Sequence, residues 1–270
     1  MKIRLLILTL LIGTSICHAG GKRIISLASS LTKSIYYLEA QDQLVGRTSY
    51  CFVADKDNKE VVASAVTVNI EKVLSLKPDL VIATGITDPE TIELIRKAGI
   101  KTEIFQTPRN FSEVCSQFRR LASLCGSEKL ADSIIKESQK TLDDIKAYYK
   151  GKTPRKVFFQ IGANPLFAAI ENTFMDDYIT LAGGTNIAAG LKKGTVNREW
   201  VLMKNPDVII IVTMGLAGDD EMKIWQSYPH LKAAKNNSIF FVESDMASTP
   251  NPVDFVETMK VLHRHLSKLP

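Results

Sequence analysis

Several features that mark enzymes and membrane proteins are scarce in this sequence of 270 residues. It has only four histidines, and His263 and His265 are two residues apart, so they cannot form the i, i+4 pair of a zinc hydrolase helix. It has neither a G-x-S-x-G motif nor a P-loop. No apolar run approaches the roughly twenty residues of a membrane-spanning helix. We therefore predict no catalytic residue, no metal site and no enzymatic activity.

Cysteine and net charge are also low. After the N-terminal segment only Cys51, Cys115 and Cys125 remain, an odd number. Cys115 and Cys125 are ten residues apart on one predicted helix, or about 15 Å, which is too far for a disulfide. We expect both to be buried thiols. The net charge of +5 is small and the charges are interspersed, which argues against nucleic-acid binding.

The N-terminus has the pattern of an export signal. Two basic residues precede the apolar run 5–12, and small residues occupy the −3 and −1 positions of a cut after Ala19. We therefore predict that residues 1–19 are a signal peptide and that the mature protein is periplasmic. Lipid anchoring through Cys17 is the less favoured alternative, because Ile16 is bulky where such processing requires a small residue.

The rest of the chain contains an internal repeat. NIEKVLSLKPDLVI at 69–82 matches NREWVLMKNPDVII at 197–210, with seven of fourteen positions identical and an offset of 128 residues. In each copy an asparagine can cap a short helix, and a glutamate follows in the first turn, where the helix dipole favours it. A proline then ends the helix before an apolar run typical of a strand covered on both faces. The repeat predicts two lobes of one design.

Strands and helices alternate around both copies, which predicts an α/β fold with a mainly parallel sheet in each half. Between the halves, residues 127–149 carry one helical stripe without Gly or Pro, about 35 Å long. A further helix near 220–234 is predicted to face the surface, and Trp225 on it to pack rather than to contact a ligand. The predicted parts are an N-terminal α/β lobe at 22–125, a single linking helix at 127–149 and a C-terminal α/β lobe at 153–270.

Two lobes joined side by side create a cleft, and open parallel sheets bind ligands beyond the carboxyl ends of their strands. The segments that leave those ends are therefore the candidate ligand-binding loops. They are 28–30, 46–52, 84–87, 162–167, 213–215 and 245–250.

Five segments carry a resemblance to a known family. They are 45–51 (VGRTSYC), 69–82, 156–167 (KVFFQIGANPLF), 182–187 (AGGTNI) and 197–210. In these the chain resembles the periplasmic binding proteins of vitamin B12, haem and ferric-siderophore ABC importers, above all the vitamin B12-binding branch. The resemblance implies a monomer without a cofactor that binds a corrinoid between its lobes and delivers it to an ABC transporter permease. Haem or a ferric siderophore is the alternative ligand, and a ligand sensor of the same fold is the alternative function.

The resemblance also implies roles for single residues. Glu71 and Glu199, which the repeat places at equivalent points, match the glutamates that dock onto arginines of the permease. Val53, Ala65 and Lys193 stand where the vitamin B12-binding branch has aromatic residues, and Lys193 is able to meet an acidic group of a ligand. The expected ligand-binding residues are Tyr50, Cys51, Phe52, Phe167, Asp245 and Met246. Tyr50 and Cys51 are also potential ligands of a metal carried by the solute, such as haem iron.

Overall fold

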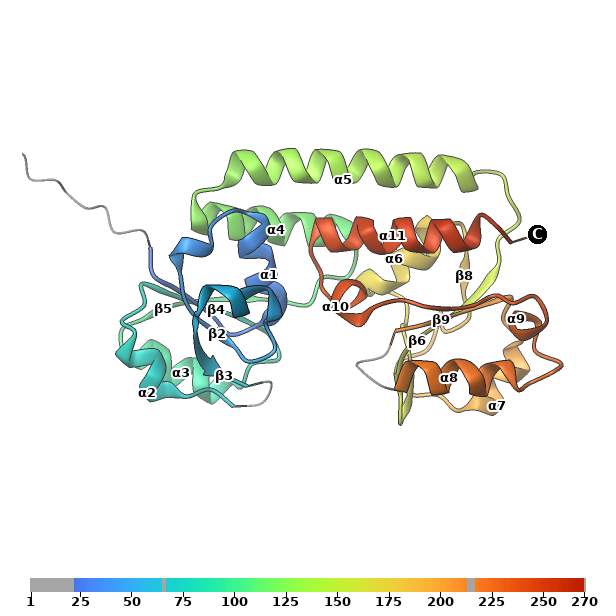
Figure 1. The fold of residues 1–270 in the computed structure, drawn as a ribbon, viewed down its shortest axis with the longest axis horizontal. Helices are drawn as coiled ribbons and strands as arrows, with labels where there is room; N and C mark the ends of the chain where they lie inside the picture. Colours follow the sequence, from blue (N-terminus) through green and yellow to red (C-terminus); the bar gives the residue numbers. More distant parts are fainter. Residues whose placement is uncertain (1–21, 65–66, 213–216, 270) are drawn as a thin grey trace, which may run out of the picture.

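The computed structural model describes residues 22–64, 67–212 and 217–269, without the side chains of 217–219. These residues form two α/β lobes side by side, spanned by one long helix (Figure 1). None of the described helices has the length and apolar character needed to cross a membrane. The predicted signal peptide lies outside the described residues.

The N-terminal lobe has a five-stranded, fully parallel sheet in the order β3-β2-β1-β4-β5. The apolar side chains of successive residues in β4 belong alternately to two buried clusters, so helices or loops cover both faces of this strand, as the sequence predicts. The strands are β1 (Ile24–Ser26), β2 (Leu44–Thr48), β3 (Glu60–Ala63), β4 (Leu80–Thr84) and β5 (Lys101–Phe105). The helices are α1 (Ser29–Tyr37), η1 (Gln41–Gln43), η2 (Phe52–Asp57), α2 (Ile70–Ser75), α3 (Pro89–Lys97) and α4 (Phe111–Cys125).

The C-terminal lobe has a sheet in the order β10-β9-β6-β7, with β8 also paired to β6. All of its pairs are parallel except β6 with β7, which turn back on each other as a short antiparallel ribbon. The strands are β6 (Lys156–Ala163), β7 (Leu166–Ala168), β8 (Thr185–Asn186), β9 (Val208–Ile211) and β10 (Ile239–Phe241). The helices are α6 (Phe174–Leu181), α7 (Arg198–Lys204), α8 (Ala217–Gln226), α9 (Lys232–Lys235), α10 (Ser244–Ala247) and α11 (Pro252–Leu266).

One prediction for this lobe is wrong. The single helix expected near 220–234 is two helices, α8 and α9, because Pro229 disfavours the helical conformation of the residue before it. The side chain of Trp225 is fully buried and not at the surface. It packs in the lobe, which is the role that the sequence favours over ligand contact.

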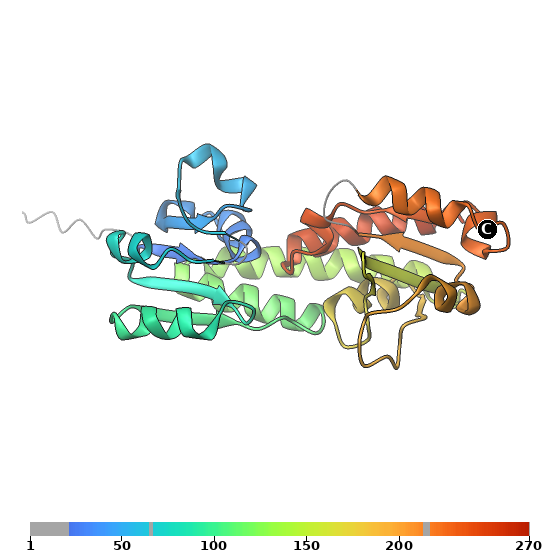
Figure 2. The same cartoon turned by 90° about the horizontal axis from the view of Figure 1, so that it is seen from below.

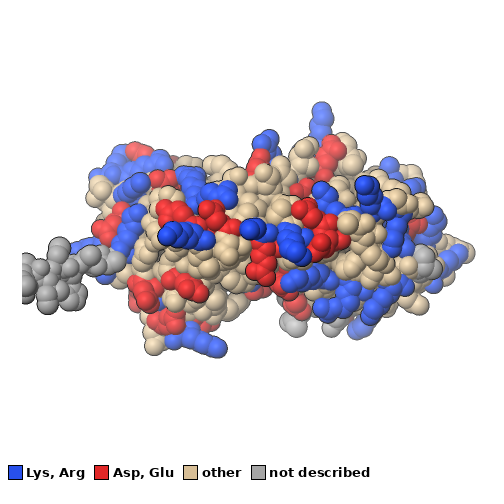
Figure 3. All heavy atoms as spheres, turned by 90° about the horizontal axis from the view of Figure 1, so that it is seen from above, with Lys and Arg blue, Asp and Glu red and all other residues tan. Residues whose placement is uncertain are grey.

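The two lobes are spanned by α5 (Glu128–Tyr149), a helix of 22 residues, about 33 Å long. It follows Gly126, which has a positive φ of 75°, and ends before Gly151, which has a φ of 80°. It packs against α4 of one lobe and α11 of the other, and Figure 2 shows it running behind both. Its outer face carries lysines and acidic residues interspersed with one another (Figure 3).

The internal repeat forms the same structure in both lobes. In each copy the asparagine side chain accepts a hydrogen bond from the backbone N–H three residues later, at 2.9 Å, and so caps α2 or α7. Further along, Asp79 accepts from the backbone N–H of Arg23 at 2.8 Å, and Asp207 accepts from that of Lys156 at 2.8 Å. The repeat therefore fixes the pairing of β4 with β1 and of β9 with β6.

All three cysteines of the described chain are free and buried. Cys115 and Cys125 lie on α4, as predicted, and face the apolar core. Burial raises the pKa of Cys115 to about 12 and that of Cys125 to about 11. Both thiols are therefore protonated at neutral pH and behave as small apolar side chains.

Candidate ligand-binding cleft

A cavity of about 180 Å³ lies where the two lobes meet. On the N-terminal side its wall is formed by the ends of β4 and β5, at Thr84 and Phe105, and by α1 and α4. On the C-terminal side it is formed by Phe174 at the start of α6 and by Ser248 and Pro250 between α10 and α11. This is the position beyond the carboxyl ends of parallel strands where the topology places a ligand.

The side chains that line this cavity are neutral. Gln106 and Gln117 supply amide groups, and the serines of α1 supply hydroxyls. Phe118 and Phe174 give the wall an apolar body, and Ile86 at the mouth is almost fully exposed. The cavity therefore suits an uncharged part of a solute that has both apolar surface and hydrogen-bonding groups.

Three of the predicted ligand-binding aromatic residues are exposed. The side chain of Tyr50 is 59% exposed and that of Phe52 is 67% exposed, and both follow the carboxyl end of β2. Phe167, on β7 of the other lobe, is 37% exposed. None of the three lines the 180 Å³ cavity, so their role in ligand binding stays a prediction.

Two residues that the sequence did not single out hold these aromatic residues. A Cβ atom at Gly194 would lie 2.4 Å from Cε1 of Phe167, so only glycine leaves room for the ring in this position. The buried guanidinium of Arg47 pairs with Asp55 at 2.7 Å and donates to the carbonyls of Thr48 and Cys51 at 3.3 Å, which fixes the turn that carries Tyr50. A lone arginine in a strand and a lone glycine in a loop gave no signal in the sequence.

The remaining predicted ligand residues have different environments. Cys51 is buried, and its thiol lies 3.8 Å from the carbonyl oxygen of Ser29. Burial raises the pKa of this thiol. Asp245 is exposed and accepts a hydrogen bond from Lys33 of the other lobe at 2.8 Å, whereas Met246 is half-buried against the core of its own lobe. The described residues contain no cluster of His, Cys, Asp and Glu that could hold a metal ion.

Three positions carry non-aromatic residues where the vitamin B12-binding branch has aromatic ones, and the structure describes two of them. Val53 is exposed in η2, and Lys193 is exposed in the loop between β8 and α7. Ala65 lies outside the described residues, as do 213–215, one of the candidate loops.

The two predicted docking glutamates lie on equivalent helices. Glu71 is in the first turn of α2 and Glu199 in the first turn of α7, and both are exposed. Figure 1 shows α2 and α7 at the side of the molecule remote from α5, one on each lobe.

The family model for periplasmic binding proteins matches residues 24–246, most of the chain. This chain belongs to that family. The resemblance to periplasmic solute-binding proteins that the sequence carries is therefore confirmed.

Among curated relatives of this periplasmic binding protein, a vitamin B12-binding protein of Vibrio cholerae is 28% identical over 243 residues, which cover 88% of this chain and 87% of the relative. The vitamin B12-binding protein of Photorhabdus laumondii is 27% identical over 217 residues, which cover 79% of this chain and 77% of the relative.

Solved structures show the same two-lobe fold. The crystal structure of the periplasmic vitamin B12 binding protein BtuF of Vibrio cholerae matches with a TM-score of 0.77 and 26% identity, over 92% of this chain and 97% of that one. The periplasmic heme binding protein HutB of Vibrio cholerae matches with a TM-score of 0.80 over 91% of this chain and 98% of that one, but at 20% identity it shows the fold alone. The predicted fold of two α/β lobes with mainly parallel sheets is confirmed.

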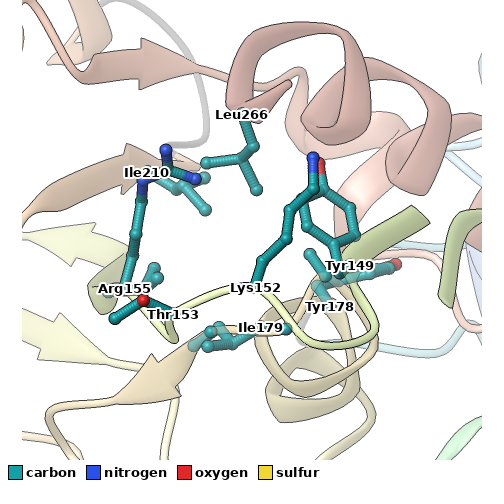
Figure 4. Close-up of a pocket in the computed structure, with 12 residues that line it drawn as sticks. Tyr149, Lys152, Thr153, Arg155, Tyr178, Ile179, Ile210 and Leu266 are labelled. Atoms are coloured by element: carbon teal, nitrogen blue, oxygen red, sulfur yellow. The ribbon is translucent and has the colours of Figure 1, made fainter. Parts of the chain in front are cut away.

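A second cavity of this periplasmic binding protein lies within the C-terminal lobe (Figure 4). Tyr149, at the end of α5, and Lys152 border it on one side, and Ile210 and Leu266 lie on the other. Its volume is about 10 Å³, which holds at most one water molecule. The interlobe cleft is therefore the candidate site for a solute.

Proposed function

We propose that this chain is the periplasmic substrate-binding component of an ABC importer and that it captures a corrinoid, a vitamin B12-like solute, in the cleft between its lobes. The observation that carries the choice of ligand is the match of 88% of the chain to vitamin B12-binding relatives at 28% identity. The neutral cavity and the exposed aromatic residues support it, because a corrinoid combines a large apolar macrocycle with amide side chains.

Tyr50, Phe52 and Phe167 are the proposed aromatic contacts, together with Asp245 as a hydrogen-bond acceptor. Cys51, which is buried, and Met246, which is half-buried, are proposed to support the loops that present these side chains. Lys193 adds a positive charge, which suits an acidic group at the rim of the ligand.

Haem or a ferric siderophore is the second candidate, because the phenol of Tyr50 is exposed and a tyrosinate oxygen is a good ligand of ferric iron. The same cleft would then hold an iron complex and not a corrinoid.

Isothermal titration of the mature protein with cobalamin, cobinamide, haemin and a ferric hydroxamate chelate tests the choice. We expect heat with a corrinoid. Phe52→Ala and Phe167→Ala should each weaken binding by about 2- to 12-fold, which corresponds to about 0.5–1.5 kcal/mol per aromatic contact. Leu94→Ala, which removes another exposed apolar side chain remote from the cleft on α3, is the control. Binding of haemin or the chelate without a corrinoid would reject the corrinoid assignment and favour the second candidate.

Glu71 and Glu199 are proposed to pair with basic residues of the permease. Reversal of both charges, Glu71→Lys with Glu199→Lys, should abolish uptake of the ligand by cells and leave its affinity for the isolated protein unchanged. One reversal alone should have a small effect, because an exposed ion pair contributes about 0–1 kcal/mol.

The matched control for this experiment is Glu128→Lys with Glu137→Lys, which makes the same change of charge at exposed sites on α5, away from α2 and α7. Uptake that survives reversal of Glu71 and Glu199 would reject the docking sites. If the protein binds the ligand tightly but cells take up the ligand equally well without the protein, the result would favour the alternative function as a ligand sensor.

A further inference from the structure

Lys33 of the N-terminal lobe lies between two carboxylates of the C-terminal lobe. Its Nζ is 2.8 Å from Oδ2 of Asp245, 3.1 Å from the backbone oxygen of Asp245 and 3.1 Å from Oδ2 of Asp254. An ammonium group has three hydrogens, so these acceptors satisfy all of its donors. This contact joins α1 to α10 and α11 across the two lobes, and Ser34 and Ser248, which line the cavity, are near neighbours of these residues in the sequence.

The two carboxylates differ in environment. The side chain of Asp254 is 5% exposed, whereas that of Asp245 is 72% exposed, and that of Lys33 between them is 17% exposed. Asp254 is held rigidly, because it accepts hydrogen bonds from Asn251 Nδ2 at 2.6 Å and from Tyr37 Oη at 2.8 Å. It is therefore a fixed anchor, and Asp245 is the partner that a ligand can reach.

The ammonium of Lys33 remains charged in this position. Partial burial acts to lower the pKa of Lys33, but the hydrogen bond to Asp245 and the charge of Asp254 outweigh it and raise the pKa above its ordinary value. Burial raises the pKa of Asp254, and the hydrogen bonds from Asn251 and Tyr37 and the charge of Lys33 oppose this rise.

We propose that Lys33 is a positioning residue: anchored by Asp254, it fixes the carboxylate of Asp245 across the lobes so that Oδ1 presents an acceptor to an N–H donor of the ligand, such as a primary amide. This inference rests on the proposed function of the cleft. Lys33 engages Oδ2 and the backbone oxygen, and Thr249 Oγ1 donates to the same backbone oxygen at 2.6 Å. Within the described part of the chain, no hydrogen bond or ion pair engages Oδ1 of Asp245.

The physical reason for such an arrangement is preorganisation. An exposed aspartate in a short helix samples several rotamers, and a ligand that binds it must restrict that motion at a cost in free energy. A tether from the opposite lobe removes most of that cost before the ligand arrives. It does so only while the lobes keep their present separation, so the tether also links affinity to the geometry of the cleft.

A double-mutant cycle tests whether the effect of Lys33 on ligand affinity requires Asp245. The affinity is measured by isothermal titration with cobinamide as the probe. Lys33→Met should weaken binding about tenfold in the wild-type background, the equivalent of one well-placed hydrogen bond, and by less than about twofold in the Asp245→Asn background. Lys129→Met, on the exposed face of α5, should have no effect in either background. An equal loss from Lys33→Met in both backgrounds, or no loss in either, would overturn the inference.

Two further measurements separate this inference from folding and from the identity of the ligand. Lys33→Met leaves Asp254 buried without its counter-ion. Lys33→Met with Asp254→Asn removes that unpaired charge, and this variant should lose affinity as Lys33→Met does. In the ligand-free protein, the ¹³C carboxyl resonance of Asp245 should move and broaden in Lys33→Met and stay in place in Lys129→Met. A resonance that stays in place in both variants rejects the inference, whereas a resonance that moves without any corrinoid binding rejects the ligand alone.

Discussion

The two lobes share one repeated unit but differ in what they bury beside it. In the C-terminal lobe a polar network runs through the interior: Gln160 on β6 accepts from Trp225 Nε1 at 2.7 Å and donates to Glu221 at 2.9 Å. Glu221 also pairs with Arg198 at 2.6 Å, and the guanidinium of Arg198 lies 4.8 Å from the ring centre of Trp225. The network therefore connects the central strand to α7, the helix that carries Glu199.

The N-terminal lobe is apolar at the equivalent positions. The pairing of β1 with β4 and of β6 with β9 places Leu27 opposite Gln160 in the repeat, and the offset of the repeat places Ile70 opposite Arg198. Both Leu27 and Ile70 pack among apolar side chains. One backbone unit therefore accepts either an apolar or a hydrogen-bonded core at these positions.

The largest difference between the lobes should follow from removal of one carboxylate in each. Glu221→Ala leaves Arg198 and Gln160 without their partner inside the lobe, and should lower the free energy of unfolding by about 3–5 kcal/mol. Asp55→Ala removes the exposed partner of Arg47, which keeps its carbonyl acceptors, and should cost about 1 kcal/mol or less. Urea unfolding followed by circular dichroism measures both, and equal losses would show that the two ion pairs are energetically alike.

A second contrast concerns two glycines, one in each lobe, that each end a helix. Gly99 ends α3 with a φ of 82° and has open space around its Cα, whereas Gly183 ends α6 with a φ of 66° and a Cβ there would lie 2.8 Å from Cβ of Tyr149. Gly99→Ala should cost about 1 kcal/mol from backbone strain alone. Gly183→Ala adds a clash with α5 and should cost about 2–4 kcal/mol. Thermal unfolding of the two variants measures the difference, and a cost at Gly183 no larger than that at Gly99 would contradict the packing against α5.

A third comparison should show no difference. Asn69 and Asn197 cap α2 and α7 with hydrogen bonds of equal length, so Asn69→Ala and Asn197→Ala should each destabilise the protein by about 1 kcal/mol. Asn→Ser at either position retains an acceptor and should restore most of the loss. Unequal effects in urea unfolding would show that the surroundings, and not the shared unit, determine the strength of the cap.

The smallest effect should be the contribution of two histidines of the C-terminal lobe to the pH dependence of stability. Burial lowers the pKa of His263 and of His265 on α11, with Lys152 and Lys268 adding to it, while residues 22–125 contain no histidine. The unfolded chain then binds more protons near pH 6, so the contribution of these histidines to stability is present above about pH 6.5 and is lost as the pH falls toward their lowered folded values.

Both rings are partly exposed, so solvent screening limits this contribution to a few tenths of a kcal/mol. The loss of unfolding free energy between pH 7.5 and pH 5.5 should be larger in the wild type than in His263→Gln with His265→Gln. Carboxylates that titrate in the same range are common to both proteins and cancel in the difference. An identical loss would show that the histidines do not contribute.

Most of the secondary structure could be predicted because it depends on local patterns. The cap, glutamate and proline of each repeat copy define α2 and α7, and the long stripe without Gly or Pro defines α5. The partners of Trp225 could not be predicted, because they are distant in the chain. Its indole N–H donates to Gln160 and its ring packs against Phe158, both on β6, and no pattern near residue 225 indicates these residues.

The sequence by itself determined the α/β class, the two equivalent lobes and the linking helix, because these follow from periodicity, capping and internal similarity within short windows. It also indicated the family, through the resemblance of five segments to known binding proteins. Only the tertiary structure decided how the lobes meet. Lys33 and Asp245 are 212 residues apart in the chain, and the cavity between Thr84 and Ser248 exists only where two separately folded sheets face each other. Contacts of this kind depend on the packing of α5 against both lobes, which sets the relative position of residues that share no local pattern.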